Sequence, residues 1–278
     1  MQQHTVIVIP CYNEAQRLHL AEFRRFVRKQ LGVEFLFVND GSTDATLEIL
    51  RDFSREDPQR VKVLNLEQNS GKAEAVRQGI LKALDDSPDL VGFTDADLAT
   101  PLEECLRLMH VLASKRELAL AVGIRLPLAG HHIERRMLRR WIGRGFAKAA
   151  SLVLGVTVTD TQCGAKFFPA NDFTKYLFGT KFTSRWLFDV EILARFLVAN
   201  GRQTARHRFY ELPLDAWREV PGSKLKPRDF VRAVGELAAI YGEYFLLAKW
   251  KDRYPGPLPT EAPVTLRMYP EDQGRRAA

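Results

Sequence analysis

The stretch TVIVIPCYNE, Thr5 to Glu14, runs an unbroken series of β-branched residues into a proline and then into a polar turn. Such a run is typical of a buried strand. Three more short apolar runs end near polar or turn residues: EFLFVND (Glu34–Asp40), VKVLNL (Val61–Leu66) and LVGFTD (Leu90–Asp95). Segments of about 10 to 17 residues with helical spacing lie between them. The alternation predicts an α/β fold with a mostly parallel, doubly wound sheet flanked by helices.

The rhythm changes after LALAVGIR (Leu118–Arg125), where a basic loop begins. We expect a helix over about 139–154, a second one within RWLFDVEILARFLVANG and a last one over about 227–250. The proline-rich YPGPLPTEAPV predicts an extended tail over 254–278. We therefore interpret residues 1–253 as a single domain with C-terminal helices, in which a first half, 1–124, is followed by a second, 125–253.

The composition is that of a globular protein with an anionic partner. Hydrophobic residues make up 46% of the 278 residues, and Lys plus Arg exceed Asp plus Glu by 41 to 34. This excess favours a phosphate, nucleic-acid or acidic-lipid partner, and arginines cluster between Arg135 and Lys148. Cys11, Cys105 and Cys163 lack a metal-binding spacing and suit a reducing compartment. No window holds the ~18 apolar residues of a membrane span, so we expect neither a span nor a signal peptide.

Polar loops follow the predicted strands at the edge where parallel sheets bind ligands. Asp95 and Asp97 in DADLAT are oxygen donors of the kind that Mg²⁺ or Mn²⁺ prefers. Asp40 in NDGSTD can accept hydrogen bonds from a base or ribose, and Lys72 in NSGK stands at a helix start that suits an anion. Taken singly, each motif also fits a capped turn, with Asp97 as the cap of a helix that starts near Pro101. Together they predict a nucleoside diphosphate and a divalent metal.

These motifs resemble those of the family 2 glycosyltransferases, which have the Rossmann-like GT-A fold. The matching segments are VIPCYNE, FVNDGSTDAT, NSGKAEAVRQGI, FTDADLAT, DTQCGAKFF, RWLFDVEIL and WREVPGSK, and the resemblance covers about residues 5–250. The downstream segments are most similar to enzymes that glycosylate a polyprenyl phosphate. Among these the chain looks most like the dolichyl-phosphate glucosyltransferases, with the dolichyl-phosphate mannosyltransferases as close cousins.

The resemblance implies a nucleotide-sugar site in the first half and an acceptor site in the second. The residues that it assigns to the donor are Pro10, Tyr12, Glu14, Asp40, Lys72 and Asp95. It also implies that Asp95 and Asp97 hold Mg²⁺ or Mn²⁺ on the donor pyrophosphate, with Asp97 as a direct ligand. The mannosyl branch has a glutamine ligand where this chain has Ala99, which leaves the third protein ligand open and favours the glucosyl branch. UDP-glucose is then the implied donor and GDP-mannose the alternative.

The chemistry of the acceptor decides which other residues the reaction needs. A phosphate monoester, whose second pKa is about 6, is an anion at neutral pH and needs cations rather than a base. The resemblance makes Arg125 and Arg139 the first choices for a lipid phosphate, and Arg218 and Lys224 in WREVPGSK are further candidates. A hydroxyl acceptor would need a base, which Asp189 could supply. The other role open to Asp189 is pairing with an arginine of the acceptor loop.

Two apolar stretches are candidates for contact with a membrane. RRMLRRWIGRGFAKAASLVLGV mixes arginines with large apolar residues, as an interfacial helix does. LAAIYGEYFLLAKW is the second, and we favour a core helix for it. We expect a peripheral enzyme at the cytoplasmic face of a membrane that takes a nucleotide sugar and a polyprenyl phosphate in inverting transfer. Nucleic acid is not an expected partner, because a nucleic-acid-binding protein would leave DAD and NDGS unexplained.

Overall fold

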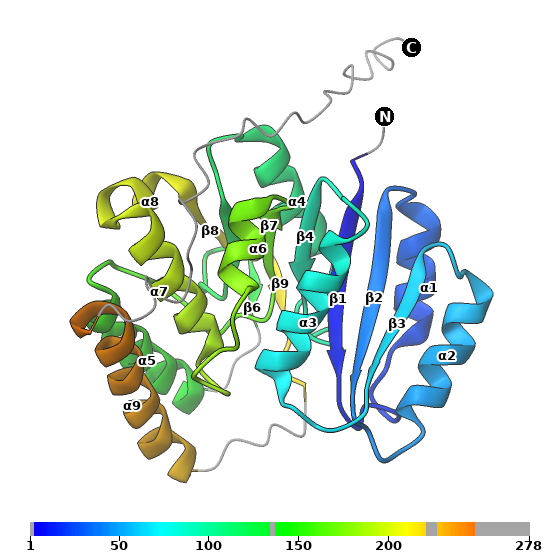
Figure 1. The fold of residues 1–278 in the computed structure, drawn as a ribbon, viewed down its shortest axis with the longest axis horizontal. Helices are drawn as coiled ribbons and strands as arrows, with labels where there is room; N and C mark the ends of the chain where they lie inside the picture. The colour runs from blue at the N-terminus through cyan, green and yellow to red at the C-terminus, as the bar shows by residue number, and fades with distance from the viewer. Residues whose placement is uncertain (1–2, 134–136, 221–226, 248–278) are drawn as a thin grey trace.

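The computed structural model describes residues 3–133, 137–220 and 227–247 (Figure 1). The strands are β1 (Thr5–Cys11), β2 (Val33–Asp40), β3 (Val61–Leu66), β4 (Leu90–Phe93), β5 (Leu120–Ile124), β6 (His132–Ile133), β7 (Lys166–Pro169), β8 (Phe209–Pro213) and β9 (Ala216–Trp217). The helices are α1 (Leu20–Lys29), α2 (Thr46–Glu56), α3 (Lys72–Leu84), α4 (Leu102–Ser114), α5 (Met137–Leu154), α6 (Asp172–Phe178), α7 (Phe188–Asn200), α8 (Arg202–Arg208), α9 (Pro227–Tyr241) and the π-helix η1 (Gly242–Leu246). The predicted tail over 254–278 lies outside the described residues.

Seven of the strands form one sheet, in the order β3-β2-β1-β4-β7-β5-β8. β1 pairs in parallel with β2 and β4, β2 with β3, and β5 with β8. β7 is the exception, because it runs antiparallel between β4 and β5. β6 and β9 form a separate parallel pair. The prediction of a mostly parallel sheet is confirmed, but it lacked β7 and β8, and β7 is the strand that joins β4 to β5.

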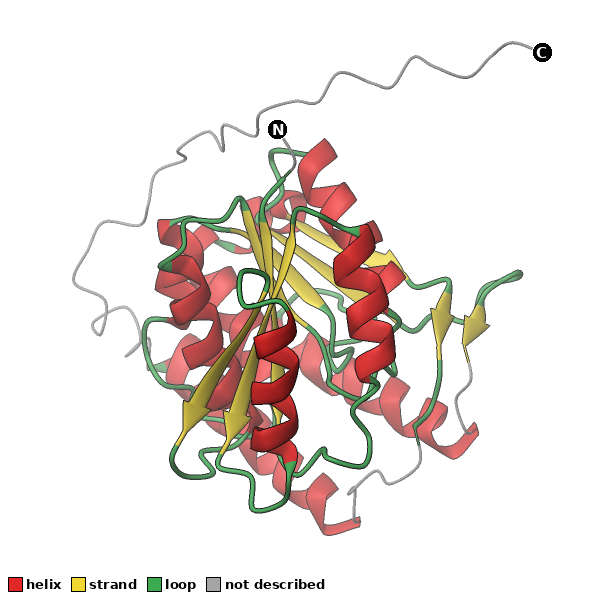
Figure 2. Cartoon of the chain, turned by 90° about the vertical axis from the view of Figure 1, so that its right-hand side faces the viewer, coloured by secondary structure: helices red, strands yellow, loops and turns green. Residues whose placement is uncertain are grey.

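Helices cover both faces of the sheet, as Figures 1 and 2 show. Along β1, Ile7 belongs to a core that includes residues of α1, α2 and α4, whereas Val8 belongs to a core that includes residues of α3 and α7. Because both faces are buried, the strand needs apolar residues at consecutive positions. Helix α3 lies so close to β1 that a Cβ on Gly79 would come within 2.4 Å of Val8 Cγ1.

The last helix is shorter than predicted and only partly a core helix. α9 ends at Tyr241, and η1 follows it. Ile240 and Tyr244 are buried, but Leu246 is 70% exposed and Leu247 also lies at the surface. The prediction of a core helix is therefore wrong for one face of this segment. Among the described residues, no helix is long and apolar enough to cross a membrane.

Candidate active site

The turn that carries Asp97 follows β4 directly. Leu98 has a φ of 51°, a left-handed conformation that is costly for a bulky residue, and its buried side chain packs in the core on the α1 and α4 side. Asp97 Oδ1 accepts a hydrogen bond of 3.1 Å from the backbone N–H of Ala99. α4 begins only at Leu102 and has no side-chain cap, so the alternative role of Asp97 as a helix cap is wrong. The carboxylate instead closes its own turn.

Asp95 lies among positive charges that come from distant parts of the chain. Lys72 Nζ forms an ion pair with Asp95 Oδ1. Burial would raise the pKa of Asp95, but the charges of Lys72, Lys166 and Arg125 outweigh it and hold this pKa below its usual value. On its other side Asp95 meets Gly164, where a Cβ would stand 2.2 Å from Oδ2. Only glycine leaves room for the carboxylate at that point.

The two carboxylates of this turn could hold a divalent cation. Burial and the neighbouring charge of Asp95 raise the pKa of Asp97, which is the effect expected of a pair of neighbouring carboxylates. A hard cation that accepts oxygen ligands would fit it. Within residues 3–133, 137–220 and 227–247 there is no group of three or more His, Cys, Asp and Glu side chains that could hold a metal. The protein would thus contribute Asp95 and Asp97, and the donor and water would supply the remaining ligands.

Asp40 has a structural role that the sequence did not predict. Its carboxylate is buried, and its two oxygens accept hydrogen bonds from the backbone N–H groups of Ser70, at 2.7 Å, and Gly71, at 2.8 Å. Gly71 has a φ of 90°, a conformation that favours glycine, and it directly precedes Lys72, the first residue of α3. Asp40 therefore fixes the loop that positions Lys72, and its contact with a base or ribose stays a prediction.

The remaining predicted donor residues lie at the same edge of the sheet. Pro10 is in β1, and the parallel pairing of β1 with β2 brings the loop that follows beside the end of β2. The backbone N–H of Glu14 donates to Thr46 Oγ1 at 2.8 Å, and the carboxylate of Glu14 forms an ion pair with Arg17. Tyr12 is partly exposed. Their contacts with a nucleotide stay predictions.

Arg125 is held from two sides at the end of β5. Its Nε and Nη2 donate to Asp160 Oδ2 and Oδ1 at 2.7 and 2.8 Å, and its side chain is 11% exposed. Its Cζ lies 5.1 Å from the centre of a Trp217 ring. The Asp160 fork uses two of the five N–H donors of a guanidinium. The group is thus fixed in orientation and retains donors for an anion.

Asp189 pairs with a lysine rather than with an arginine. Lys166 Nζ donates to Asp189 Oδ1 at 2.5 Å, and both side chains are buried. The same ammonium donates to the backbone carbonyls of Thr161, at 3.1 Å, and Cys163, at 2.7 Å. Sequence reasoning gave Lys166 no role, although a lysine inside the apolar run AKFF was a signal of a buried ion pair.

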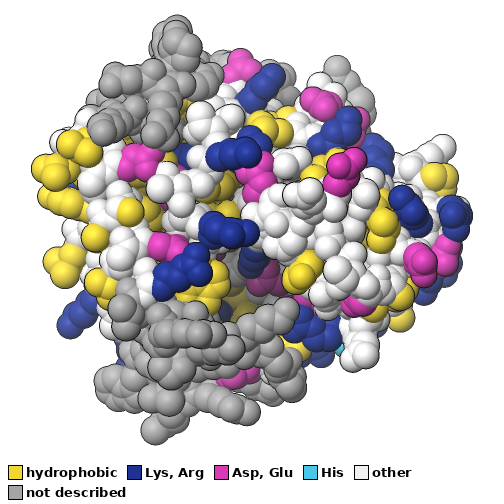
Figure 3. Space-filling model, turned by 60° about the horizontal axis from the view of Figure 1, so that its bottom comes forward, with side chains coloured by type: hydrophobic (Ala, Val, Ile, Leu, Met, Phe, Trp, Pro, Cys, Tyr) yellow, Lys and Arg dark blue, Asp and Glu magenta, His cyan; other side chains and the backbone are white. Residues whose placement is uncertain are grey.

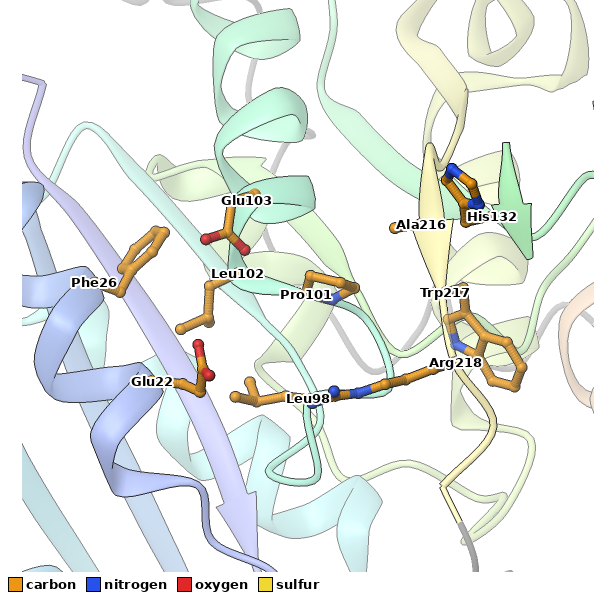
Figure 4. A pocket seen from close by; sticks show the side chains of 10 residues that line it. All are labelled: Glu22, Phe26, Leu98, Pro101, Leu102, Glu103, His132, Ala216, Trp217 and Arg218. Atoms are coloured by element: carbon orange, nitrogen blue, oxygen red, sulfur yellow. The ribbon is translucent and has the colours of Figure 1, made fainter. Parts of the chain in front are cut away.

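Of the other acceptor candidates, Arg218 lies within the described part of the structure with its side chain. The backbone N–H of Arg218 donates to the carbonyl of Ala99 at 3.0 Å, and Arg218 lines a cavity with Leu98 and Trp217 beside the turn (Figure 4). Arg139 belongs to α5, but its side chain lies outside the described part of the structure, as does the whole of Lys224. The acceptor roles of Arg139 and Lys224 stay predictions.

One edge of the sheet therefore brings together side chains of opposite charge. The charges of Asp95, Asp97 and Asp189 all act on Lys72, and that of Arg125 acts on Asp95. Figure 3, which brings this edge forward, shows Lys and Arg side chains beside Asp and Glu around a hollow. An arrangement of this kind can bind a cation and phosphate groups side by side.

Known proteins are similar to this chain in sequence and in fold. A model of the family "Glycosyl transferase family 2" matches residues 6–177. Dolichyl-phosphate beta-glucosyltransferase ALG5C of Trichomonas vaginalis is 31% identical over 269 residues, which cover 92% of this chain and 76% of that protein. Dolichyl-phosphate beta-glucosyltransferase of Drosophila melanogaster is 34% identical over 239 residues, with 80% and 69% covered.

Solved structures show the same fold at lower identity. Glucosyl-3-phosphoglycerate synthase from Mycobacterium tuberculosis, in complex with Mn²⁺, UDP-glucose and phosphoglyceric acid, gives a TM-score of 0.63 at 17% identity. The match covers 90% of this chain and 80% of that one. Mannosyl-3-phosphoglycerate synthase from Rubrobacter xylanophilus also gives 0.63, at 12% identity, with 91% and 76% covered. The predicted GT-A fold is confirmed.

Proposed function

The chain belongs to glycosyl transferase family 2 and is a glycosyltransferase, and from that premise we propose that it moves glucose from UDP-glucose to a polyprenyl phosphate of the dolichyl type. The names of its relatives support glucose as the sugar and a dolichyl phosphate as the acceptor. Ala99 in DADLAT supports the glucosyl rather than the mannosyl branch. The synthase structure of the same fold, which is in complex with UDP-glucose, supports UDP-glucose as the donor.

The pairing of Asp189 with Lys166 is the observation that best supports a phosphate acceptor. A hydroxyl acceptor needs a base that can take its proton, whereas Asp189 Oδ1 accepts from an ammonium that two backbone carbonyls also hold. A phosphate acceptor needs no base. It needs oriented cations, and Arg125, fixed by Asp160 and Trp217, is such a group.

The mechanism that we propose is a single displacement. An oxygen of the acceptor phosphate forms a bond to the anomeric carbon as the bond from that carbon to the donor diphosphate breaks, and the bonding electrons leave with the diphosphate. The configuration inverts because there is one displacement. Arg125 would orient the acceptor phosphate, with Arg139, Arg218 and Lys224 as further candidates. Asp95 and Asp97 would hold Mg²⁺ or Mn²⁺, which supplies positive charge to the departing diphosphate.

We also propose that the enzyme works as a peripheral protein at the cytoplasmic face of a membrane. Exposed large apolar side chains gather on α5, α9 and η1: Leu152, Val234, Tyr241, Leu246 and Leu247. Leu152 is 82% exposed. Exposed apolar side chains that lie together, rather than singly, are typical of an interaction surface. Hydrophobic side chains are frequent on the left of Figure 3, the side on which Figure 1 places α5 and α9. Apolar residues on neighbouring helices suit contact with a lipid interface.

A transfer assay with extraction into organic solvent tests the proposal. The protein is incubated with a polyprenyl phosphate in vesicles, Mn²⁺ or Mg²⁺, and radiolabelled UDP-glucose or GDP-mannose in parallel. We expect label from UDP-glucose in the lipid phase. Label from GDP-mannose alone would favour the mannosyl alternative, and no lipid-bound label with any donor would overturn the proposal. Labelling of a saccharide that Asp189→Asn abolishes would instead support a hydroxyl acceptor.

A further inference from the structure

Lys72 lies at the N-terminal end of helix α3, and this end of a helix disfavours positive charge. It is the first residue of α3, where the helix dipole and the unpaired N–H groups attract negative charge. Its side chain is 41% exposed, and its Nζ pairs with Asp95 Oδ1. Asp189 and Asp97 also lie near enough for their charges to act on this ammonium.

The ammonium therefore lies among the carboxylates that would hold a metal. Of the two oxygens of Asp95, Oδ2 is the one that the backbone of Gly164 crowds, since a Cβ there would stand 2.2 Å away. Oδ1 is the oxygen that Lys72 contacts. Asp189 is engaged by Lys166, whereas Asp95 is the carboxylate that Lys72 contacts directly.

We propose that Lys72 and the divalent cation compete for Asp95 Oδ1, and that the donor diphosphate resolves this competition. The inference rests on the metal-assisted transfer proposed above. Two cations at one carboxylate repel each other, so the metal alone binds weakly. A nucleoside diphosphate adds negative charge that both cations can share. Once it is bound, Lys72 leaves Asp95 and, with the N–H groups of α3, contacts a donor phosphate.

Titration of the protein with Mn²⁺ in the absence of nucleotide, followed by calorimetry, tests this exchange. We expect Lys72→Met to bind Mn²⁺ at least about tenfold more tightly than the wild type, because the competing charge is gone. Lys72→Arg keeps the charge and should bind as weakly as the wild type. Lys62→Met is the matched control, since Lys62 Nζ pairs with Glu34 and Asp86, at 2.8 and 2.9 Å, away from the site.

A second titration, with UDP at saturating Mn²⁺, tests the other half of the exchange. We expect Lys72→Met to bind UDP about tenfold more weakly, because one phosphate contact is lost. Equal or weaker Mn²⁺ binding by Lys72→Met, or no Mn²⁺ binding by any of these proteins even with UDP, would overturn the inference. Neither titration involves a lipid acceptor, so failure of glucosyl transfer to lipid would count against the proposed function and leave the exchange standing. Circular dichroism spectra that match between Lys72→Met and Lys62→Met verify the fold.

Discussion

The edge of the site that we propose for the donor and the edge that we propose for the acceptor are built in different ways. At the donor edge, a carboxylate fixes its surroundings through backbone N–H groups: Asp40 holds Ser70 and Gly71, and Asp97 holds Ala99. At the acceptor edge, charged side chains hold one another, Arg125 with Asp160 and Lys166 with Asp189. Hydrogen bonds from backbone N–H groups are therefore prominent at the donor edge, where Lys72 also pairs with Asp95, whereas buried pairs of charged side chains hold the acceptor edge.

The largest effect that we expect tests the acceptor edge. Lys166→Met should lower the free energy of unfolding by about 3 to 5 kcal/mol, because it leaves the charge of Asp189 buried without a partner. Unfolding in urea measures the change. The double variant Lys166→Met, Asp189→Leu removes both charges and should recover part of the loss. A loss below about 1 kcal/mol in the single variant would contradict the distinction drawn between the two edges.

The next effect concerns catalysis at the donor edge. Asp97→Asn should lower the rate of glucosyl transfer by about 10² to 10³, because it would remove the charge of a proposed ligand of the metal that assists the departing diphosphate. Single-turnover transfer to lipid measures it. Asp52→Asn is the matched control, since Asp52 lies on the exposed side of α2 and pairs with Arg55. Equal rates in Asp97→Asn and the control would remove Asp97 from the mechanism.

A smaller effect is expected where a donor-edge carboxylate supports the backbone. Asp40→Asn should lower the free energy of unfolding by about 1 to 3 kcal/mol, because an amide has one accepting oxygen for two N–H groups. The same urea series measures the change, beside Lys166→Met. A loss as large as that of Lys166→Met would mean that the two edges are equally dependent on buried charge.

The smallest expected effect tests whether Trp217 positions Arg125. Trp217→Leu removes the ring that lies against its guanidinium and should lower kcat/KM for the lipid phosphate about tenfold, with the KM for the nucleotide sugar unchanged. Trp217→Phe keeps a ring and should lose less. If Phe and Leu have the same effect, or if the KM of the donor changes equally, then Trp217 supports the fold and does not position Arg125.

The same difference explains what the sequence could predict. Asp40, Lys72, Asp95 and Asp97 lie at the ends of predicted strands or after them, and their proximity could be predicted because the ends of parallel strands meet at one edge. The partners of Arg125 and Asp189 could not be found in this way. The partner of Asp189 is Lys166, which enters the sheet through the antiparallel insertion of β7 between β4 and β5, and the partners of Arg125 lie outside the predicted strands. Neither periodicity nor spacing reports such an insertion.

The burial of residues in the C-terminal helices is a second property that the sequence predicted only in part. LAAIYGEYFLLAKW contains enough apolar residues for a core helix, and Ile240 and Tyr244 do pack inward. Hydropathy alone does not say how wide the buried face is, and the change from α9 to η1 alters the spacing of the residues along it. Leu246 and Leu247 consequently lie at the surface.

The hydrogen bond from the backbone N–H of Arg218 to the carbonyl of Ala99 bears on how this enzyme could be re-engineered. Both atoms belong to the main chain, so the contact does not depend on which side chains stand at positions 99 and 218, proline at 218 excepted. An exchange of Ala99 for the glutamine of the mannosyl branch would therefore leave this contact in place. The side chain at position 99 can thus be varied without displacing the main chain that carries Arg218.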